Sequence, residues 1–287
     1  MQLPAGWYNF YYHDVSRDPR VPAAVRTSPE RFDAEMRFLK HHFEVVAFEQ
    51  GLRRLQDGQL DRAYASVSFD DGYCGVLEHA LPVLAREQVP HTLFLNSAFL
   101  DGAAVSDSII AQVLQQDGNA LRACMHPQRY AETWSRVKRQ FDWHGLFLDR
   151  PSLSRFPAGL TQFGNHTRHH YWLAGLSRQD QESEIAGNHE LLRHLPGYVS
   201  LLALPFGTSD CFDDTTLAVN DAVHGNAVIK AVGGIGHRLE QGRWIVERMN
   251  MSDEKPRIDD VIRLRVTGRD LGYRLRKFGR NVRRWFH

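Results

Sequence analysis

The sequence lacks the features that mark secreted, membrane-spanning or disordered proteins. It has three cysteines in 287 residues, an odd and scattered set that indicates free thiols rather than a disulfide framework. No apolar run reaches the roughly 18 residues that a membrane-spanning helix needs. The first residues have neither the basic nor the apolar stretch of a signal peptide. Internal repeats and low-complexity segments are also absent, so we expect a cytoplasmic globular protein.

A large net charge is absent too, but the charge is unevenly distributed. The whole chain carries +1, whereas residues 255–287 carry +8, which leaves −7 on residues 1–254. From this contrast we predict one domain over residues 1–254 and a basic C-terminal segment over residues 255–287. Residues 100–155 are polar, mostly helical in pattern and without clear strands, so we expect a helical insertion or lid there. An acidic body without a recognition motif argues against nucleic acid as a partner.

The hydrophobic pattern predicts short strands that alternate with helices. Strands are predicted at residues 7–13, 45–48, 65–69, 91–96, 160–165, 199–204, 227–232 and 244–247. Helices are predicted at residues 29–43, 51–60, 73–88 and 177–195, with a kink or restart at Pro82. This alternation indicates βα units and a mainly parallel sheet, open or closed into a barrel.

Reactive side chains come directly after two of the predicted strands. Asp70 and Asp71 end one strand just before Gly72, and His166 and His170 follow another. Because the carboxyl ends of parallel strands meet at one edge of an α/β fold, we expect these residues to form one site. Two imidazoles and a carboxylate are enough protein ligands to bind a catalytic divalent ion. We expect zinc, with cobalt or nickel as alternatives.

The two aspartates are expected to do different work. We assign Asp71, His166 and His170 as metal ligands, because a cation keeps its ligand carboxylate ionised. Asp70 is assigned as the general base, since a carboxylate that is off the metal can accept a proton from an activated water. Thr167 is expected to orient the histidine loop through its hydroxyl.

These residues carry a resemblance to the polysaccharide deacetylase family, the NodB-homology domain of family 4 carbohydrate esterases. Residues 68–73 resemble its first motif, residues 166–170 match its second, and residues 203–207 are similar to its third. Residues 12–15 resemble the first strand of one branch of the family. The resemblance implies a distorted (β/α)7 barrel that removes an N-acyl group from an amino sugar with the help of a metal ion.

The resemblance also implies further site residues. Two features of the family's site, an arginine and a histidine motif, are missing from this sequence. It implies that the backbone N–H of Tyr73 stabilises an oxyanion and that Pro205 and Phe206 contact the substrate. The arginine of the third motif, which orients the base in the family, is replaced by alanine in this chain. The histidine motif that supplies the general acid is not recognisable, so His13 and His237 are the candidates for that role.

The C-terminal segment ends in a predicted amphipathic helix over residues 270–287. One face is apolar and the other is rich in arginine, which is typical of a helix that lies on a membrane surface. The alternative is that its apolar face packs on the barrel or on a second subunit. The sequence does not specify the oligomeric state.

A membrane-associated cytoplasmic enzyme favours a particular substrate class. We expect a lipid-linked or nucleotide-linked acylamino sugar used in cell-surface glycan or lipopolysaccharide assembly. The alternatives are a deformylase that acts on a formamido sugar and a catalytically inactive relative that only binds sugar.

Overall fold

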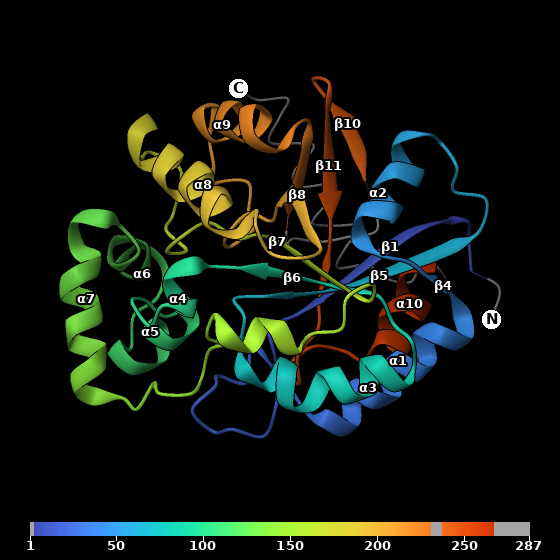
Figure 1. Cartoon of the computed structure of the whole chain (residues 1–287), viewed down its shortest axis with the longest axis horizontal. Helices are drawn as coiled ribbons and strands as arrows, with labels where there is room; N and C mark the ends of the chain where they lie inside the picture. Colours follow the sequence, from blue (N-terminus) through green and yellow to red (C-terminus); the bar gives the residue numbers. More distant parts are fainter. Residues whose placement is uncertain (1–2, 231–236, 267–287) are drawn as a thin grey trace.

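Parallel strands form the centre of the molecule and carry its reactive residues. The computed structural model describes residues 3–230 and 237–266. In the main sheet, β12, β1, β5, β6, β7 and β8 are neighbours in that order and pair in parallel (Figure 1). The bounds of these strands are Met249–Asn250, Gly6–Tyr12, Ala63–Asp70, His91–Leu95, Thr161–Asn165 and Tyr198–Leu202.

A second group of strands closes this sheet into a ring. β9 and β11 pair in parallel, while β10 is antiparallel to β11. A bridge between Ala203 and Ile229 joins the end of β8 to β9. Only Arg248 separates β11 from β12, and β12 pairs with β1, so the order of neighbours returns to the first strand. The predicted distorted barrel is therefore confirmed. The bounds of the added strands are Ala227–Lys230 for β9, Arg238–Glu240 for β10 and Arg243–Glu247 for β11.

Helices cover the outside of the ring. α1 begins where the sequence predicts, with Ser28 in an extended conformation before Pro29. Phe32, Met36 and Leu39 recur at helical spacing on one face of α1 and are fully buried. The outer helices are α1 (Pro29–His42), α2 (Phe48–Gln56), α3 (Leu81–Arg86), α8 (Arg178–Leu192) and α9 (Asp214–His224).

Three predicted elements differ in detail from the observed ones, and one of them is the helix predicted at 51–60, which is observed at Phe48–Gln56. Val76–Ala80 forms a turn of π-helix before α3, with the Leu81 N–H donating to the Val76 carbonyl. Pro82 has no N–H and lies in the first turn of α3, so the helix restarts here, which is one of the two outcomes that the sequence predicted. The strand predicted at 45–48 is shorter: β4 covers only Glu44–Val45, since Phe48 already begins α2 and is buried there.

A helical insertion lies between β6 and β7 and packs beside the barrel. Figure 1 shows its helices α5, α6 and α7 grouped at one side of the sheet. Val105, Ile109 and Val137 from this segment are fully buried in a hydrophobic cluster that also contains Leu202 of β8. The helices of this region are α4 (Ser97–Leu100), α5 (Asp107–Leu114), α6 (Gly118–Cys124), α7 (Pro127–Gln140) and a 3-10 turn at Pro151–Arg155.

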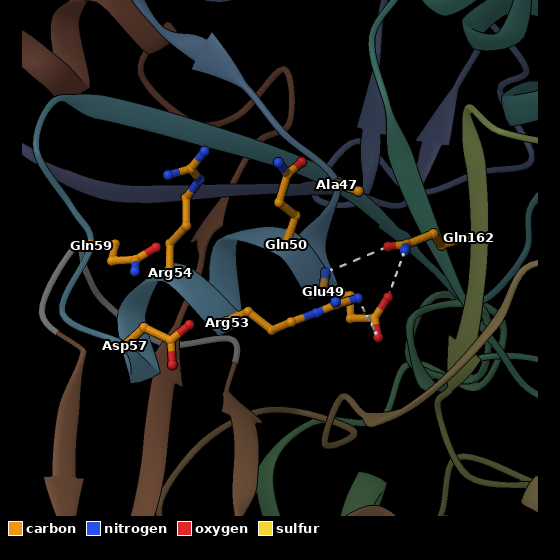
Figure 2. Close-up of a pocket in the computed structure, with 8 residues that line it drawn as sticks. All are labelled: Ala47, Glu49, Gln50, Arg53, Arg54, Asp57, Gln59 and Gln162. Atoms are coloured by element: carbon orange, nitrogen blue, oxygen red, sulfur yellow. Dashed lines mark hydrogen bonds and ion pairs between the residues drawn. The ribbon is translucent and has the colours of Figure 1, made fainter.

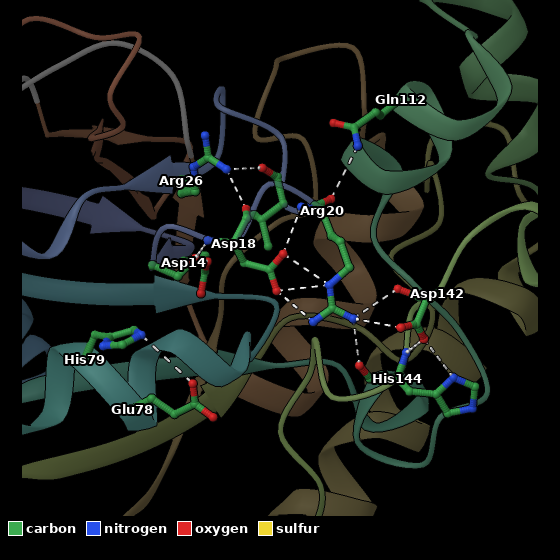
Figure 3. A network of polar contacts seen from close by, with 11 residues as sticks. Asp14, Asp18, Arg20, Arg26, Glu78, His79, Gln112, Asp142 and His144 are labelled. Atoms are coloured by element: carbon green, nitrogen blue, oxygen red, sulfur yellow. Dashed lines mark hydrogen bonds and ion pairs between the residues drawn. The ribbon is translucent and has the colours of Figure 1, made fainter.

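Arg20 attaches the insertion to the first loop of the barrel (Figure 3). This loop connects two short paired strands, β2 (Asp14–Val15) and β3 (Arg26–Thr27). The Arg20 guanidinium donates to Asp18, 2.7 Å away, and to the carbonyls of Asp142 and His144 at 3.2 and 3.1 Å. Gln112 of α5 donates to the Arg20 carbonyl at 3.3 Å. One side chain thus links the loop to the end of the insertion.

The C-terminal part that the structure describes packs against α1. α10 covers Ile258–Val266, and the side chains of Ile258 and Ile262 are buried in the barrel core. Arg31 of α1 donates to the carbonyls of Lys255 and Pro256 at 2.9 Å. The amphipathic helix predicted over residues 270–287 lies outside the described residues. Within residues 3–230 and 237–266, no helix has the length and hydrophobicity needed to span a bilayer.

Candidate metal centre

The end of β5 places two aspartates in one buried pocket. Asp70 is the last residue of the strand, and Asp71 takes a left-handed conformation with φ of 69°. Gly72 follows with φ of 73°, a conformation that glycine adopts without strain. Adjacent residues of a regular strand point to opposite faces, so this break is what lets both carboxylates serve one site. Both side chains are 2% exposed.

The loop after β7 brings in two histidines. Asn165 accepts a hydrogen bond from the Thr167 N–H at 2.8 Å, and the Thr167 hydroxyl accepts one from the His170 N–H at 3.2 Å. Thr167 and His170 both have positive φ, 63° and 61°. Non-glycine residues in this region are strained and occur most often at functional sites. The tight loop turns the imidazoles of His166 and His170 toward each other, with ring centroids 4.9 Å apart.

Asp71, His166 and His170 have the geometry of a metal site. The Oδ1 atom of Asp71 lies 3.6 Å from Nε2 of His166 and 3.7 Å from Nε2 of His170. One ligand atom from each residue lies within 4.8 Å of the other two. Tetrahedral zinc with nitrogen and oxygen ligands requires ligand atoms about 3.4 Å apart. These three residues therefore can hold one divalent ion with little adjustment.

The protonation of these groups also fits a cation. Burial lowers the pKa of His166 to about 3 and also lowers the pKa of His170, so both imidazoles are neutral at physiological pH. Nδ1 of His166 lies 2.8 Å from the Ala203 carbonyl, which fixes the proton on Nδ1 and leaves Nε2 free to bind a metal. Oδ1 of Asp71 is buried and has no hydrogen-bond partner among the described residues. Such an atom is costly unless a cation compensates it.

Asp70 is held by an arginine that the sequence analysis missed. Arg248 donates to both carboxylate oxygens of Asp70 at 2.7 Å, and it also donates to the Ser68 hydroxyl at 3.1 Å. Its guanidinium lies over the ring of Tyr11, 4.4 Å from the centroid, and the side chain is fully buried. Burial alone raises the pKa of Asp70, but Arg248, His166 and His13 lower it to about 2. Asp70 is therefore an ionised and oriented carboxylate beside the histidines.

Arg248 makes the contact with Asp70 that the resemblance assigns to the arginine of the third motif, the position that Ala203 holds here. Ala203, at that motif position, contributes only its carbonyl, which accepts from His166. Arg248 comes from the end of β11, a predicted strand that finishes at the same edge of the barrel. A basic residue directly after a strand end is the signal that could have identified it.

The insertion contributes another unpredicted residue, Asp107. It is the first residue of α5, and its Oδ1 atom lies 3.4 Å from Nδ1 of His170. This distance is slightly longer than an ordinary hydrogen bond. Nε2 of His170 faces Asp71, and Asp107 faces the other ring nitrogen, Nδ1. Metal-binding histidines usually have a hydrogen-bonding partner at that second nitrogen. No local pattern marks Asp107 in the sequence.

The structure separates the two histidines that were candidates for the general acid. His13 directly follows β1 at the site, and its Nδ1 is buried without a partner among the described residues. Burial lowers the pKa of His13 to about 4, although Asp70 and Asp107 act in the opposite direction. Nε2 of His237 instead lies 2.7 Å from the carbonyl of Trp7, near the start of β1. Because β1 rises about 3.3 Å per residue, Trp7 is roughly 16 Å along the strand from its end. The structure does not bring His237 to the cluster.

The other predicted residues surround the cluster. The Tyr73 hydroxyl lies 2.6 Å from the Ser106 hydroxyl, so this side chain contacts the insertion. Phe206, which follows Pro205, has φ of 59°, and its ring lies 4.8 Å from that of His170. The oxyanion and substrate roles of Tyr73, Pro205 and Phe206 stay predictions.

A cavity that none of the cluster residues lines is found beside α2 (Figure 2). It has a volume of about 490 Å³, and Arg53 and Gln162 are among the residues that line it. Gln162 stands at the start of β7, whereas His166 directly follows the end of that strand. Its side chain hydrogen-bonds to Glu49 in this cavity. We therefore place the candidate site at the histidines and not in this cavity.

This chain was compared with protein families and with known proteins. The family described as polysaccharide deacetylase matches residues 57–224, more than half of the chain. The search of curated proteins gives no match.

Several solved structures have a similar fold. IcaB from Ammonifex degensii has a TM-score of 0.62 and 18% identity, with 88% of this chain and 94% of that chain covered. The deacetylase PplD from Streptococcus pyogenes, in complex with acetate, has a TM-score of 0.56 and 15% identity, with 91% and 97% covered. A de-N-acetylase from Aggregatibacter actinomycetemcomitans has a TM-score of 0.55 and 15% identity, with 87% and 96% covered.

Proposed function

Because this chain belongs to the polysaccharide deacetylase family, we propose that it hydrolyses the N-acyl group of an acylamino sugar in a metal-dependent reaction. The observation that carries the proposal is the buried cluster of Asp71, His166 and His170 beside the ionised carboxylate of Asp70. A structural neighbour with bound acetate supports acetyl as the acyl group.

The ligand residues and the base have separate tasks in this reaction. Asp71, His166 and His170 would hold a divalent ion, zinc in our proposal, which would act as a Lewis acid on the amide carbonyl and lower the pKa of bound water. Asp70 accepts a proton from the attacking water on its carboxylate. Arg248 keeps that carboxylate ionised and fixes its direction through two hydrogen bonds.

The remaining steps need an oxyanion donor and an acid. The hydroxyl group of water adds to the acyl carbon, and the carbonyl oxygen that gains charge accepts a hydrogen bond from the backbone N–H of Tyr73. The proton that Asp70 takes from water is returned to the nitrogen as the C–N bond breaks, with His13, whose Nδ1 is buried at the same end of the barrel, as our candidate for the group that relays it. The products are a carboxylate and a free amino sugar.

We extend the proposal to the location and the sugar. The basic residues 255–287 beside an acidic body support an enzyme that works at the inner surface of the cytoplasmic membrane. There it acts on a lipid-linked or nucleotide-linked sugar in surface-glycan or lipopolysaccharide assembly.

The central test separates the base from the ligands. Purified protein loaded with zinc is incubated with a panel of N-acylamino sugars, and the released amine and carboxylate are measured by mass spectrometry. We expect Asp70→Asn to lower kcat by about 10²- to 10⁴-fold and to keep the metal, whereas His166→Ala loses it. Metal content is measured by atomic absorption. Equal metal content in His166→Ala and the wild type contradicts the ligand assignment.

A further inference from the structure

A second cavity lies between the insertion and the loop that follows His170. It has a volume of about 470 Å³ and is lined by the start of α7, by α6 and by Trp172. The two sides are joined, because the Trp172 N–H donates to the Met125 carbonyl at 3.1 Å. The far end of the loop is also held, since the Gly175 N–H donates to Asp213 at 3.0 Å. Hydrogen bonds to different elements thus hold the cavity wall in place.

The ring of Phe206 separates the cavity from the candidate metal centre and contacts both. The ring of Phe206 lies 4.8 Å from that of His170 and 4.9 Å from that of Trp172. Trp172 is therefore two ring contacts away from a proposed metal ligand. A substrate with its acyl group at the metal centre would have to extend past these two rings to reach the cavity.

The lining of the cavity is basic. The guanidinium of Arg122 lies over the ring of Trp172, 3.8 Å from its centroid, and Asp210 holds it at 2.9 Å. Arg129 and His126 also line the cavity, and no carboxylate is among the lining residues. Within the described part of the chain, Arg129 forms no ion pair. Arginine recognises phosphate through parallel hydrogen bonds, and stacking on an aromatic ring orients its planar group.

We propose that this cavity is an anion subsite that binds a phosphate group attached to the acylamino sugar. The inference rests on the proposed function, because it assigns the substrate of that site to the class of sugar phosphates. Arg122 and Arg129 contact the phosphate, and Trp172 orients Arg122. The phosphate can belong to a free sugar 1-phosphate, a nucleotide diphosphate sugar or a lipid diphosphate sugar.

The test compares one N-acetyl sugar in four forms. These are the free sugar, its 1-phosphate, its nucleotide diphosphate and its lipid diphosphate in detergent micelles. We expect the wild type to have a kcat/KM at least about tenfold higher for the phosphate-bearing forms, because hydrogen bonds to charged groups are strong. In the double variant Arg122→Gln/Arg129→Gln, the ratio of phosphorylated to free sugar falls to about one. The preferred phosphate-bearing form identifies the source of the phosphate.

A matched control removes the same charge from elsewhere on α7. Arg136 and Arg139 are exposed and do not line the cavity, so Arg136→Gln/Arg139→Gln keeps the wild-type ratio. The proposal is overturned if the wild type does not prefer phosphorylated sugars, if the cavity variant keeps the preference, or if the control loses it equally. Thermal unfolding checks that both variants fold.

If no sugar is deacetylated, the proposed function is contradicted, but the subsite is not. A binding experiment then tests the subsite by itself. The metal-loaded wild type and both double variants are titrated with N-acetylglucosamine 1-phosphate by calorimetry. The subsite is supported if binding is at least about tenfold weaker in the cavity variant and unchanged in the control variant. Equal affinity in all three proteins rejects it.

Discussion

At the residue scale, two neighbouring aspartates have opposite electrostatic surroundings. Arg248 pairs with both oxygens of Asp70, and the pKa of this carboxyl is lowered to about 2 although burial opposes it. Burial, together with the carboxylates of Asp107 and Asp70, raises the pKa of Asp71 well above its ordinary value. Only a bound cation makes the ionised form of Asp71 favourable. This contrast supports the proposed roles of Asp70 as the base and Asp71 as a metal ligand.

The role of Arg248 gives a prediction with a defined pH dependence. In the wild type, Asp70 is ionised at every pH above about 2 to 3. In Arg248→Met, nothing of equal strength opposes the burial of Asp70, so its pKa rises. The activity then falls as the pH decreases through the raised pKa. We expect a loss of about 10²- to 10⁴-fold in kcat/KM at pH 6, measured as a pH profile between 5 and 9.

The matched variant for this prediction is Arg248→Lys. Lysine keeps the charge but cannot form two parallel hydrogen bonds, so an intermediate activity is expected. A flat pH profile in Arg248→Met, with unchanged kcat/KM, contradicts the orienting role.

Asp107 gives a prediction about metal affinity. In Asp107→Ala, His170 loses the carboxylate near its Nδ1 atom. Loss of such a partner typically weakens metal binding by about 10- to 100-fold. Chelator competition with zinc measures this without any substrate. Asp107→Asn keeps an oxygen acceptor and should retain most of the affinity; equal zinc affinity in Asp107→Ala and the wild type removes Asp107 from the site.

At the element scale, the strand ends explain why much of the site could be predicted. Asp70, Asp71, His166 and His170 each lie at or just after a strand, next to motif neighbours that break the strand or form a tight loop. Short sequence motifs at the strand ends were therefore enough to point to these four residues. Helix α9 and strand β12 were not predicted, because neither has a strong hydrophobic pattern.

The two residues that the sequence did not identify come from distant elements. Arg248 lies 178 positions after Asp70, and its role depends on how β11 continues into β12. Asp107 belongs to the insertion, and only the packing of α5 against the barrel brings it to His170. Such long-range contacts follow from ring closure and helix packing, which a single sequence does not specify.

The insertion should depend on Arg20 for its attachment. Arg20→Ala removes hydrogen bonds to the carbonyls of Asp142 and His144. We expect a loss of roughly 1–2 kcal/mol in the free energy of unfolding, together with faster hydrogen exchange in residues 107–144. Arg17→Ala is a suitable control, because Arg17 and its partner Glu30 are largely exposed. Unchanged exchange in Arg20→Ala contradicts the attachment.

At the scale of the whole molecule, buried histidines should make the fold sensitive to acid. Burial lowers the pKa of His91 to about 4, and the ring nitrogens lie near the Val89 carbonyl and the Thr161 hydroxyl. Below pH 6.5 the unfolded chain binds a proton that the folded chain binds only near pH 4. The stability from this group is therefore complete above pH 6.5 and is lost as the pH falls toward 4.

Replacing His91 should flatten this dependence. His91→Asn cannot titrate, so the free energy of unfolding changes less between pH 6.5 and 4 than in the wild type, by up to about 3 kcal/mol. Urea unfolding at several pH values measures it. His41→Asn, at an exposed position of α1, is the control and should match the wild type. The same slope in both variants contradicts the assignment to His91.

The closing strand of the ring also has a consequence for biosynthesis. Arg248 stands between β11 and β12, next to the pair of residues that meets β1. A nascent chain on the ribosome has already made both aspartates and both histidines before this arginine is translated. On the roles proposed above, the site is completed only when the last strand is made, because an incompletely assembled polypeptide lacks the arginine that orients Asp70.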